Sequence, residues 1–217
     1  MKKLLAVLLT LSTLLGFGTY TLAGSAQTAP HDADNHELDW EDVFEHPDLG
    51  LGEQTYDTTH FRIHYTLQGE MAVAKQDTDS DGTPDYVEQV AETLEHVRDV
   101  SVNQFGWAAP PADGTWGGNA LYDVYLENLY EDGVSGYVGG SQPESIIGDN
   151  PNTPNVVETN AGISYMSLDR SFKDPETSDT DALRELQSVA AHEFLHSIQY
   201  GYDALEPAHW LSEATAN

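Results

Sequence analysis

The chain has 217 residues, and 37 acidic side chains against 8 basic ones give it a formal net charge of −29. Attraction to nucleic acid or to anionic lipid depends on lysine and arginine, so this charge excludes general binding to either and favours metal cations as partners. Apolar residues make up 39% of the sequence and include 4 Trp, 11 Tyr and 6 Phe, which is enough for the core of one folded domain.

Residues 1–26 have the pattern of a secretory signal peptide. Two lysines precede an apolar run from Leu4 to Phe17, and small residues follow it. The run is shorter than the roughly 20 apolar residues that a spanning helix needs. Cleavage after Ala23 or after Ala26 satisfies the small-residue rule equally well. We therefore expect a secreted protein, extracellular or periplasmic, with no membrane attachment after cleavage and, lacking cysteine, no disulfides.

Residues 27–58 are acidic and poor in apolar side chains, and we interpret them as a linker or a short pro-segment. The folded domain is expected over 59–217. It begins with alternating residues at His60–Tyr65, which predict a strand. Apolar residues then recur at intervals of three and four from Tyr86 to Val102, which predicts an amphipathic helix.

The second half of the domain alternates strand-like and loop-like segments. Leu121–Leu126 and Ile163–Leu168 predict two further strands, and we expect the latter to be an exposed edge of the sheet. Residues 131–160 are rich in Gly, Ser, Asn and Pro without periodicity, which predicts a long loop region. A helix is expected over Asp181–Tyr200, ended by Gly201.

Within this last helix stands the sequence His192-Glu193-Phe194-Leu195-His196. Two histidines four positions apart lie on one face of a helix, so both imidazoles can reach one ion, and imidazole nitrogen suits zinc. Glu193 follows the first histidine and can hold a water beside the metal. The apolar stripe of the helix occupies other positions, namely Leu183, Leu186, Ala190, Phe194 and Ile198. The alternative is a pair of surface histidines on an ordinary amphipathic helix.

A catalytic zinc site needs a third protein ligand, and Glu213 is the preferred candidate. It follows His196 by 17 positions, so a turn can bring a second, C-terminal helix back beside the first. His209 and Asp203 are rival ligands that we rank lower. Asn217 lies four positions after Glu213 and could hydrogen-bond to a ligand. The alternative for Glu213 is a solvated helix glutamate.

A second metal site is expected at residues 77–88, which match a twelve-residue calcium loop. Gly82 occupies position 6, where the loop turns sharply, and Thr83 offers its carbonyl at position 7. Pro84 and the lack of a helix pattern before the loop distinguish it from a paired EF-hand. Carboxylates fall at positions 1, 3, 5, 9 and 12, namely Asp77, Asp79, Asp81, Asp85 and Glu88. The alternative is an acidic surface turn in an acidic protein.

These motifs together support a resemblance to a known family. The sequence HEFLHSIQYGYD followed by WLSEATAN resembles the gluzincin metalloproteases, which include thermolysin-like enzymes. It is more closely similar to secreted bacterial metalloproteases that also carry an HFRIHY-type strand and a DxDxDGxPDYVE stretch. The resemblance covers residues 58–217. It implies an α+β, zincin-like fold with a mixed sheet packed on the HExxH helix and a second helix carrying the third ligand.

The resemblance also implies site roles. His192, His196 and Glu213 would be zinc ligands, and Glu193 the general base that takes a proton from the attacking water. Because the chain ends within a helix-like stretch, we expect the C-terminal part of the domain to be missing. Tyr200 and Tyr202 are possible donors to the oxyanion.

The expected function is therefore a secreted zinc endopeptidase with a structural calcium ion and protein or peptide substrates. A non-catalytic exported calcium-binding adhesion module on the same fold is the alternative. A zinc hydrolase that acts on other substrates would use the same site.

Overall fold

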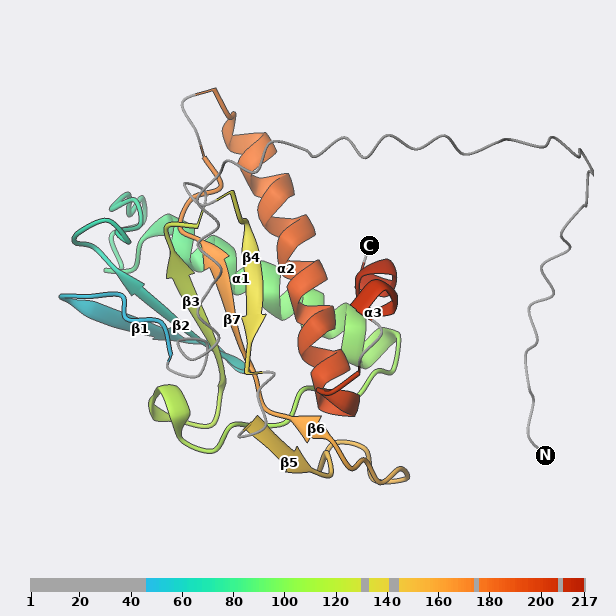
Figure 1. The fold of residues 1–217 in the computed structure, drawn as a ribbon. Coiled ribbons are helices and arrows are strands. Elements are labelled where there is room, and N and C mark those ends of the chain that lie inside the picture. The colour runs from blue at the N-terminus through green and yellow to red at the C-terminus, as the bar shows by residue number, and fades with distance from the viewer. Residues whose placement is uncertain (1–45, 130–132, 141–144, 174–175, 207–208, 217) are drawn as a thin grey trace, which may run out of the picture. The chain divides into compact units, whose positions relative to one another are not determined.

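The computed structural model describes residues 46–129, 133–140, 145–173, 176–206 and 209–216 (Figure 1). All of them belong to one compact unit that covers residues 38–217. The expected signal peptide over 1–26, most of the expected linker and Asn217 lie outside the described residues.

A five-stranded mixed sheet forms the centre of this unit. Its strand order is β1-β2-β3-β7-β4. The inner pairs β2-β3 and β3-β7 are parallel, whereas β1 and β4 pair antiparallel at the two edges. The strands are β1 (Glu53–Asp57), β2 (Phe61–Thr66), β3 (Tyr122–Glu127), β4 (Gly136–Gly139) and β7 (Tyr165–Asp169). A separate pair consists of β5 (Ile146–Gly148) and β6 (Ala161–Gly162).

Two long helices cover one face of the sheet, which confirms the α+β class. They are α1 (Asp85–Arg98), continued by the π-helix η2 (Asp99–Gln104), and α2 (Asp179–Asp203). A short helix, α3 (His209–Ala216), lies beside the C-terminal half of α2 (Figure 1). A 3₁₀ turn, η3 (Trp116–Gly118), precedes β3. No helix among the described residues combines the length and apolarity needed to cross a membrane.

Strand alternation and helical periodicity together explain the main core. Side chains on the helix-facing side of β2, β3 and β7 meet apolar side chains of α1 and α2. The strand residues are Phe61, Ile63, Tyr65, Val124, Leu126, Met166 and Leu168, and the helix residues include Val87, Val90, Leu94, Leu186, Ala190, Phe194 and Ile198. The opposite face of the sheet carries a smaller cluster of Leu49, Tyr125 and Tyr165.

The edge strand next to α2 is β4, so the expectation that Ile163–Leu168 forms the edge is wrong. The strand in that region, β7, lies between β3 and β4, and all of its residues are buried. A continuous buried run is typical of an interior strand with both neighbours in place. The expected loop over 131–160 contains β4, a four-residue strand with a glycine at each end, which is too short to show a period.

Two further boundaries differ from expectation. Glu53–Asp57 forms β1, so the expected linker over 27–58 includes a strand of the sheet. Its residues are mostly exposed and polar, as in edge strands that avoid aggregation, and therefore give no apolar alternation. Gly201 does not end α2, because the helix continues to Asp203. Gly201 instead allows close packing, since a Cβ there would lie 3.0 Å from Asn150 Nδ2.

Phe194 should be essential for stability because it joins α2 to the sheet. Its ring is 1% exposed and makes edge contacts with Phe61 and Tyr122, at centroid distances of 5.7 and 6.4 Å. We expect Phe194→Ala to lower the free energy of unfolding by about 3–5 kcal/mol in urea denaturation. Val157→Ala is the control, since Val157 is 80% exposed and its loss should change stability by less than about 0.5 kcal/mol. A Phe194→Ala cost below about 1 kcal/mol would contradict this packing.

Candidate metal centre

Helix α2 positions the histidine pair because both its start and its buried face are fixed. The Ser178 hydroxyl caps the helix by accepting a hydrogen bond from the Asp181 backbone N–H at 3.2 Å. Asp179 and Asp181 in the first turn interact favourably with the helix dipole. The buried apolar stripe holds one face of α2 against the sheet, and His192 and His196 occupy an adjacent, half-buried face.

The side chains of His192, His196 and Glu213 converge. The Nε2 atoms of the two histidines lie 3.0 Å apart. Glu213 on α3 places Oε2 3.5 Å from His192 Nε2 and Oε1 3.5 Å from His196 Nε2. The structure therefore brings together the three residues that the sequence predicts as ligands, from two helices.

This spacing fits a zinc ion. Bonds of about 2.0–2.1 Å at tetrahedral angles separate neighbouring ligand atoms by about 3.3–3.5 Å. The 3.0 Å between the two Nε2 atoms, and the 3.5 Å from each Nε2 to one or the other oxygen of the Glu213 carboxylate, are close to that value. Two imidazoles and one carboxylate form a ligand set that catalytic zinc sites use.

One residue that the sequence reasoning missed connects the two helices at this site. Gln199 Oε1 lies 2.8 Å from His196 Nδ1, and Gln199 Nε2 donates to Thr215 Oγ1 at 2.9 Å. An imidazole whose Nδ1 donates to an amide oxygen presents Nε2 as the free acceptor, which is the ligating form. The same amide holds α3, and therefore Glu213, against α2. The signal in the sequence is that Gln199 follows His196 by three positions, a spacing at which two side chains on a helix are neighbours.

Glu193 is buried next to the histidine pair. It is 7% exposed and lies under β4, because a Cβ added to Gly136 would meet Glu193 Cγ at 3.1 Å. Burial, and secondarily the nearby Glu213 carboxylate, raise the pKa of the Glu193 carboxyl to about 7. Because Gly136 has no Cβ, the edge strand can run close to this carboxyl. A buried carboxyl with a pKa near neutrality can exchange a proton with a reacting group.

A cavity of about 900 Å³ opens over these residues. It is lined by β4, through Gly136, Tyr137 and Val138, and by Glu213 of α3. His192, Glu193, His196, Tyr200 and Tyr202 also line it. The site is thus accessible to a molecule of peptide size along a strand edge.

The remaining candidate residues have other positions or partners. Asp203 lines the cavity but accepts a hydrogen bond from the Leu205 backbone N–H, and it is outside the metal-binding groups found among the described residues. The Tyr202 hydroxyl accepts a hydrogen bond from the Ala108 backbone N–H at 3.1 Å. The side chain of His209 and all of Asn217 lie outside what the structure describes.

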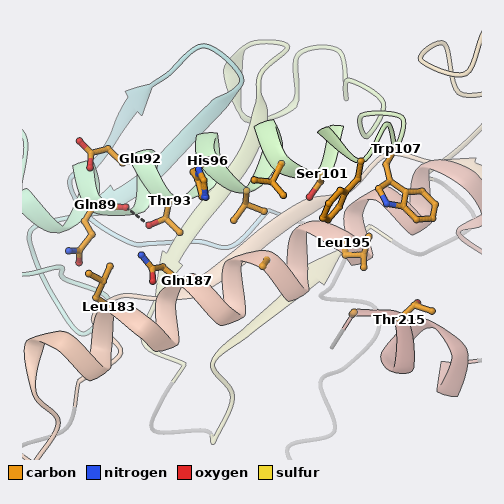
Figure 2. Close-up of a pocket in the computed structure, with 15 residues that line it drawn as sticks. Gln89, Glu92, Thr93, His96, Ser101, Trp107, Leu183, Gln187, Leu195 and Thr215 are labelled. Atoms are coloured by element: carbon orange, nitrogen blue, oxygen red, sulfur yellow. Dashed lines mark hydrogen bonds between the residues drawn. The ribbon is translucent and has the colours of Figure 1, made fainter. Parts of the chain in front are cut away.

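A second hollow, of about 840 Å³, runs between α1 and α2 (Figure 2). Figure 2 shows Gln89 and Thr93 of α1 facing Leu183 and Gln187 of α2 across it. Trp107 and Thr215 border both this hollow and the histidine cavity. None of the candidate metal-binding groups in the described part of the chain lies here. Of these two hollows, the histidine cavity is the one lined by such a group.

The expected calcium loop brings together Asp77, Asp79 and Asp81, whose carboxylate oxygens lie within 4.8 Å of one another. The loop is closed by its own backbone: Asp77 Oδ1 accepts from Ser80 N at 2.7 Å and Oδ2 from Gly82 N at 3.0 Å. Gly82 has a φ of +100°, a conformation that favours glycine. Residues 73–76, which precede the loop, form neither helix nor strand, and α1 begins at Asp85.

Asp85 does not join these three carboxylates, contrary to the expectation for position 9. Its Oδ1 accepts from the Thr78 backbone N–H at 2.7 Å, and its Oδ2 accepts from Thr78 Oγ1 and Gln76 Nε2 at 2.6 and 2.9 Å. Asp85 therefore braces the loop at the start of α1. The pKa of the Glu88 carboxyl is raised, first by desolvation and then by the negative charges of Asp81, Asp79, Asp85 and Asp77.

Comparison of the chain with family models, curated proteins and solved structures gives no match. The chemistry of the site is then the basis for function: two imidazoles and a carboxylate that converge, a buried carboxyl beside them, and a cavity along a strand edge.

Gln199 should control the docking of α3. We expect Gln199→Ala to remove the bridge to Thr215, which is worth about 1 kcal/mol, and to speed amide hydrogen exchange in α3 about fivefold. Gln187→Ala is the matched control, since Gln187 also lies on α2 but borders the other hollow. Equal exchange rates of α3 in both variants would show that the bridge does not hold this helix.

Proposed function

We propose that this protein is an exported zinc-dependent endopeptidase with a zincin-like active site. The observation that supports it most directly is the convergence of His192, His196 and Glu213 beside a buried Glu193. A non-catalytic module would gain nothing from burying that carboxyl, since burial of an ionisable group costs free energy. The pattern of residues 1–26 supports export, which places the activity outside the cytoplasm.

In this proposal His192, His196 and Glu213 hold the zinc. Bound there, zinc would polarise a peptide carbonyl and lower the pKa of a water toward neutrality. Gln199 keeps His196 in the ligating tautomer and keeps Glu213 within reach.

Glu193 is the proton carrier of the reaction. It accepts a proton from the attacking water and returns it to the leaving amine, which a carboxyl with a pKa near the working pH does efficiently. Its burial under β4 keeps bulk water from competing for that proton. Tyr200 and Tyr202 both line the cavity and are the candidate donors to the oxyanion.

The substrate would bind by strand addition along β4. This strand is the edge of the sheet, so the side that does not pair with β7 can hydrogen-bond to an extended peptide. Gly136, Tyr137 and Val138 line the same cavity as the histidines, so a peptide in that register passes over Glu193. This favours unfolded or flexible protein segments as substrates.

The acidic loop would bind a structural calcium ion. Three clustered carboxylates repel one another, and an oxygen-ligated cation relieves that repulsion. The loop leads directly into α1, which packs on α2 and on the sheet. Calcium binding would therefore stabilise the layer that carries the histidine pair.

The first test separates proton transfer from metal binding. We expect Glu193→Gln to keep its zinc, measured by elemental analysis after dialysis, and to lose cleavage of an unfolded protein substrate by about 10²–10⁴-fold. Glu185→Gln is the control, because Glu185 also lies on α2 and hydrogen-bonds to Ser135 instead. Unchanged cleavage by Glu193→Gln would show that Glu193 is not the general base.

The second test concerns calcium. After chelation lowers the Tm, and with zinc resupplied throughout, added calcium should raise the Tm again by about 5 °C or more when calcium is at 100 times its Kd. Asp79→Asn should abolish the shift. Glu92→Gln removes one exposed negative charge outside the loop and should leave the shift intact. If the Tm does not change with calcium, the acidic loop does not bind a structural calcium ion.

A further inference from the structure

A third cluster of metal-ligating side chains lies on the face of the sheet opposite α1 and α2. His46, Asp113 and Asp123 place ligand atoms within 4.8 Å of one another. Asp123 belongs to β3, where Val124 and Leu126 point to the helices, so Asp123 and Tyr125 point to the other face. The cluster is thus separated from the histidine cavity by the sheet itself.

Asp123 is buried and Asp113 is half-buried, and each has a buried carboxylate oxygen without a donor among the described residues. Asp123 is 0% exposed, and its Oδ1 contacts His64 Nε2 at 3.0 Å while its Oδ2 has no hydrogen-bond partner among the described residues. Asp113 likewise has a buried Oδ1 without a partner in the described part of the chain. A buried carboxylate oxygen without a donor is costly and rare. Here two such oxygens belong to neighbouring side chains.

The electrostatics of the cluster favour a proton or a cation beside Asp113. Burial, and then the adjacent Asp123, raise the pKa of the Asp113 carboxyl to about 8. Burial also lowers the pKa of His46, which favours the neutral imidazole that ligates metals. The Arg62 guanidinium, which interacts electrostatically with Asp123, is already paired with Asp57 through two hydrogen bonds of 2.7 and 2.8 Å.

The surroundings hold these side chains in place. His64 bridges Asp123 and Glu53, with Nδ1 2.7 Å from Glu53 Oε1, and stacks on Tyr125 at a centroid distance of 4.3 Å. The turn at Gly117 presses on Asp123 so closely that an added Cβ would lie 2.1 Å from Oδ2. Outer hydrogen bonds and close packing of this kind preorganise ligands around metals.

The ring of His46 is positioned by aromatic contacts with Tyr125, Tyr165 and Trp116, at centroid distances of 5.3, 5.5 and 5.7 Å. A cavity of about 10 Å³, enough for one water or ion, adjoins His46 and Asp113.

We propose that His46, Asp113 and Asp123 bind a second zinc ion. One imidazole and two carboxylates suit zinc, whereas calcium prefers oxygen ligands alone. The ion would join the segment before β1 and the loop before β3 to the centre of the sheet, which is a structural role. The inference is independent of the proposed peptidase function, because it uses no residue of the histidine cavity.

The experiment measures zinc content of the full chain in saturating calcium, after dialysis against zinc. The background is His192→Ala/His196→Ala, which removes the other candidate zinc site. We expect this double variant to keep about one zinc per chain. Addition of His46→Ala should reduce the zinc content to none. Zinc should raise the Tm of the double variant but not that of the triple variant. His60→Ala in the same background is the matched control, since His60 pairs with Glu95 elsewhere.

Asp113→Asn gives a result that loss of folding cannot imitate. It removes one of two repelling carboxylates and supplies an N–H donor, so we expect a higher Tm in chelator together with loss of zinc binding. The inference is overturned if the double variant binds no zinc, or if its zinc survives both His46→Ala and Asp113→Asn. Failure of the histidine site is seen separately, as equal zinc contents of the wild type and the double variant.

Discussion

The packing of α2 on the sheet is the constraint on which the rest of the structure depends. Leu186, Ala190, Phe194 and Ile198 recur along one stripe and lock the rotation of the helix about its axis. With that rotation fixed, Glu193 falls at the boundary of the buried stripe and the two histidines fall just outside it. These apolar contacts thus place a buried carboxyl and two accessible imidazoles, and α3 and β4 complete the site.

The sheet that receives α2 also divides the chemistry of the molecule. Neighbouring residues of β3 point to opposite faces, so Val124 packs under the helices while Asp123 joins the cluster on the far side. A shift of the register by one residue would exchange a core valine for a buried acid, which makes the register strongly specified. The strongly acidic composition is therefore not all solvated surface, because carboxylates occupy specific positions on both faces and in the acidic loop.

Sequence reasoning succeeded where the signal is local. The histidines lie one helical turn apart and Asp77, Asp79 and Asp81 alternate in one loop, so their proximity follows from short-range geometry. The strands β2, β3 and β7 and the long helices also have clear periods, and with them the α+β class was predictable. The polar edge strand β1, the four-residue β4 and the inner position of β7 were not, because they depend on long-range pairing. The Gln199–Thr215 bridge and the meeting of His46 with Asp113 also depend on tertiary contacts. The zincin-like character and the metals themselves stay predictions.

The exposure of Glu213 has a consequence for how the histidine site is assembled. Glu213 is 60% exposed on α3, and the Gln199–Thr215 hydrogen bond joins this helix to α2. The position of Glu213 thus depends on the contacts of α3 with α2 and on whatever Glu213 binds. Ion capture at His192 and His196 would then be a coupled folding reaction, in which a loosely docked segment closes over a rigid pair. If the proposed peptidase is exported without its ion, it would stay dormant until it meets metal outside the cell, and its maturation rate would reflect helix docking as much as diffusion.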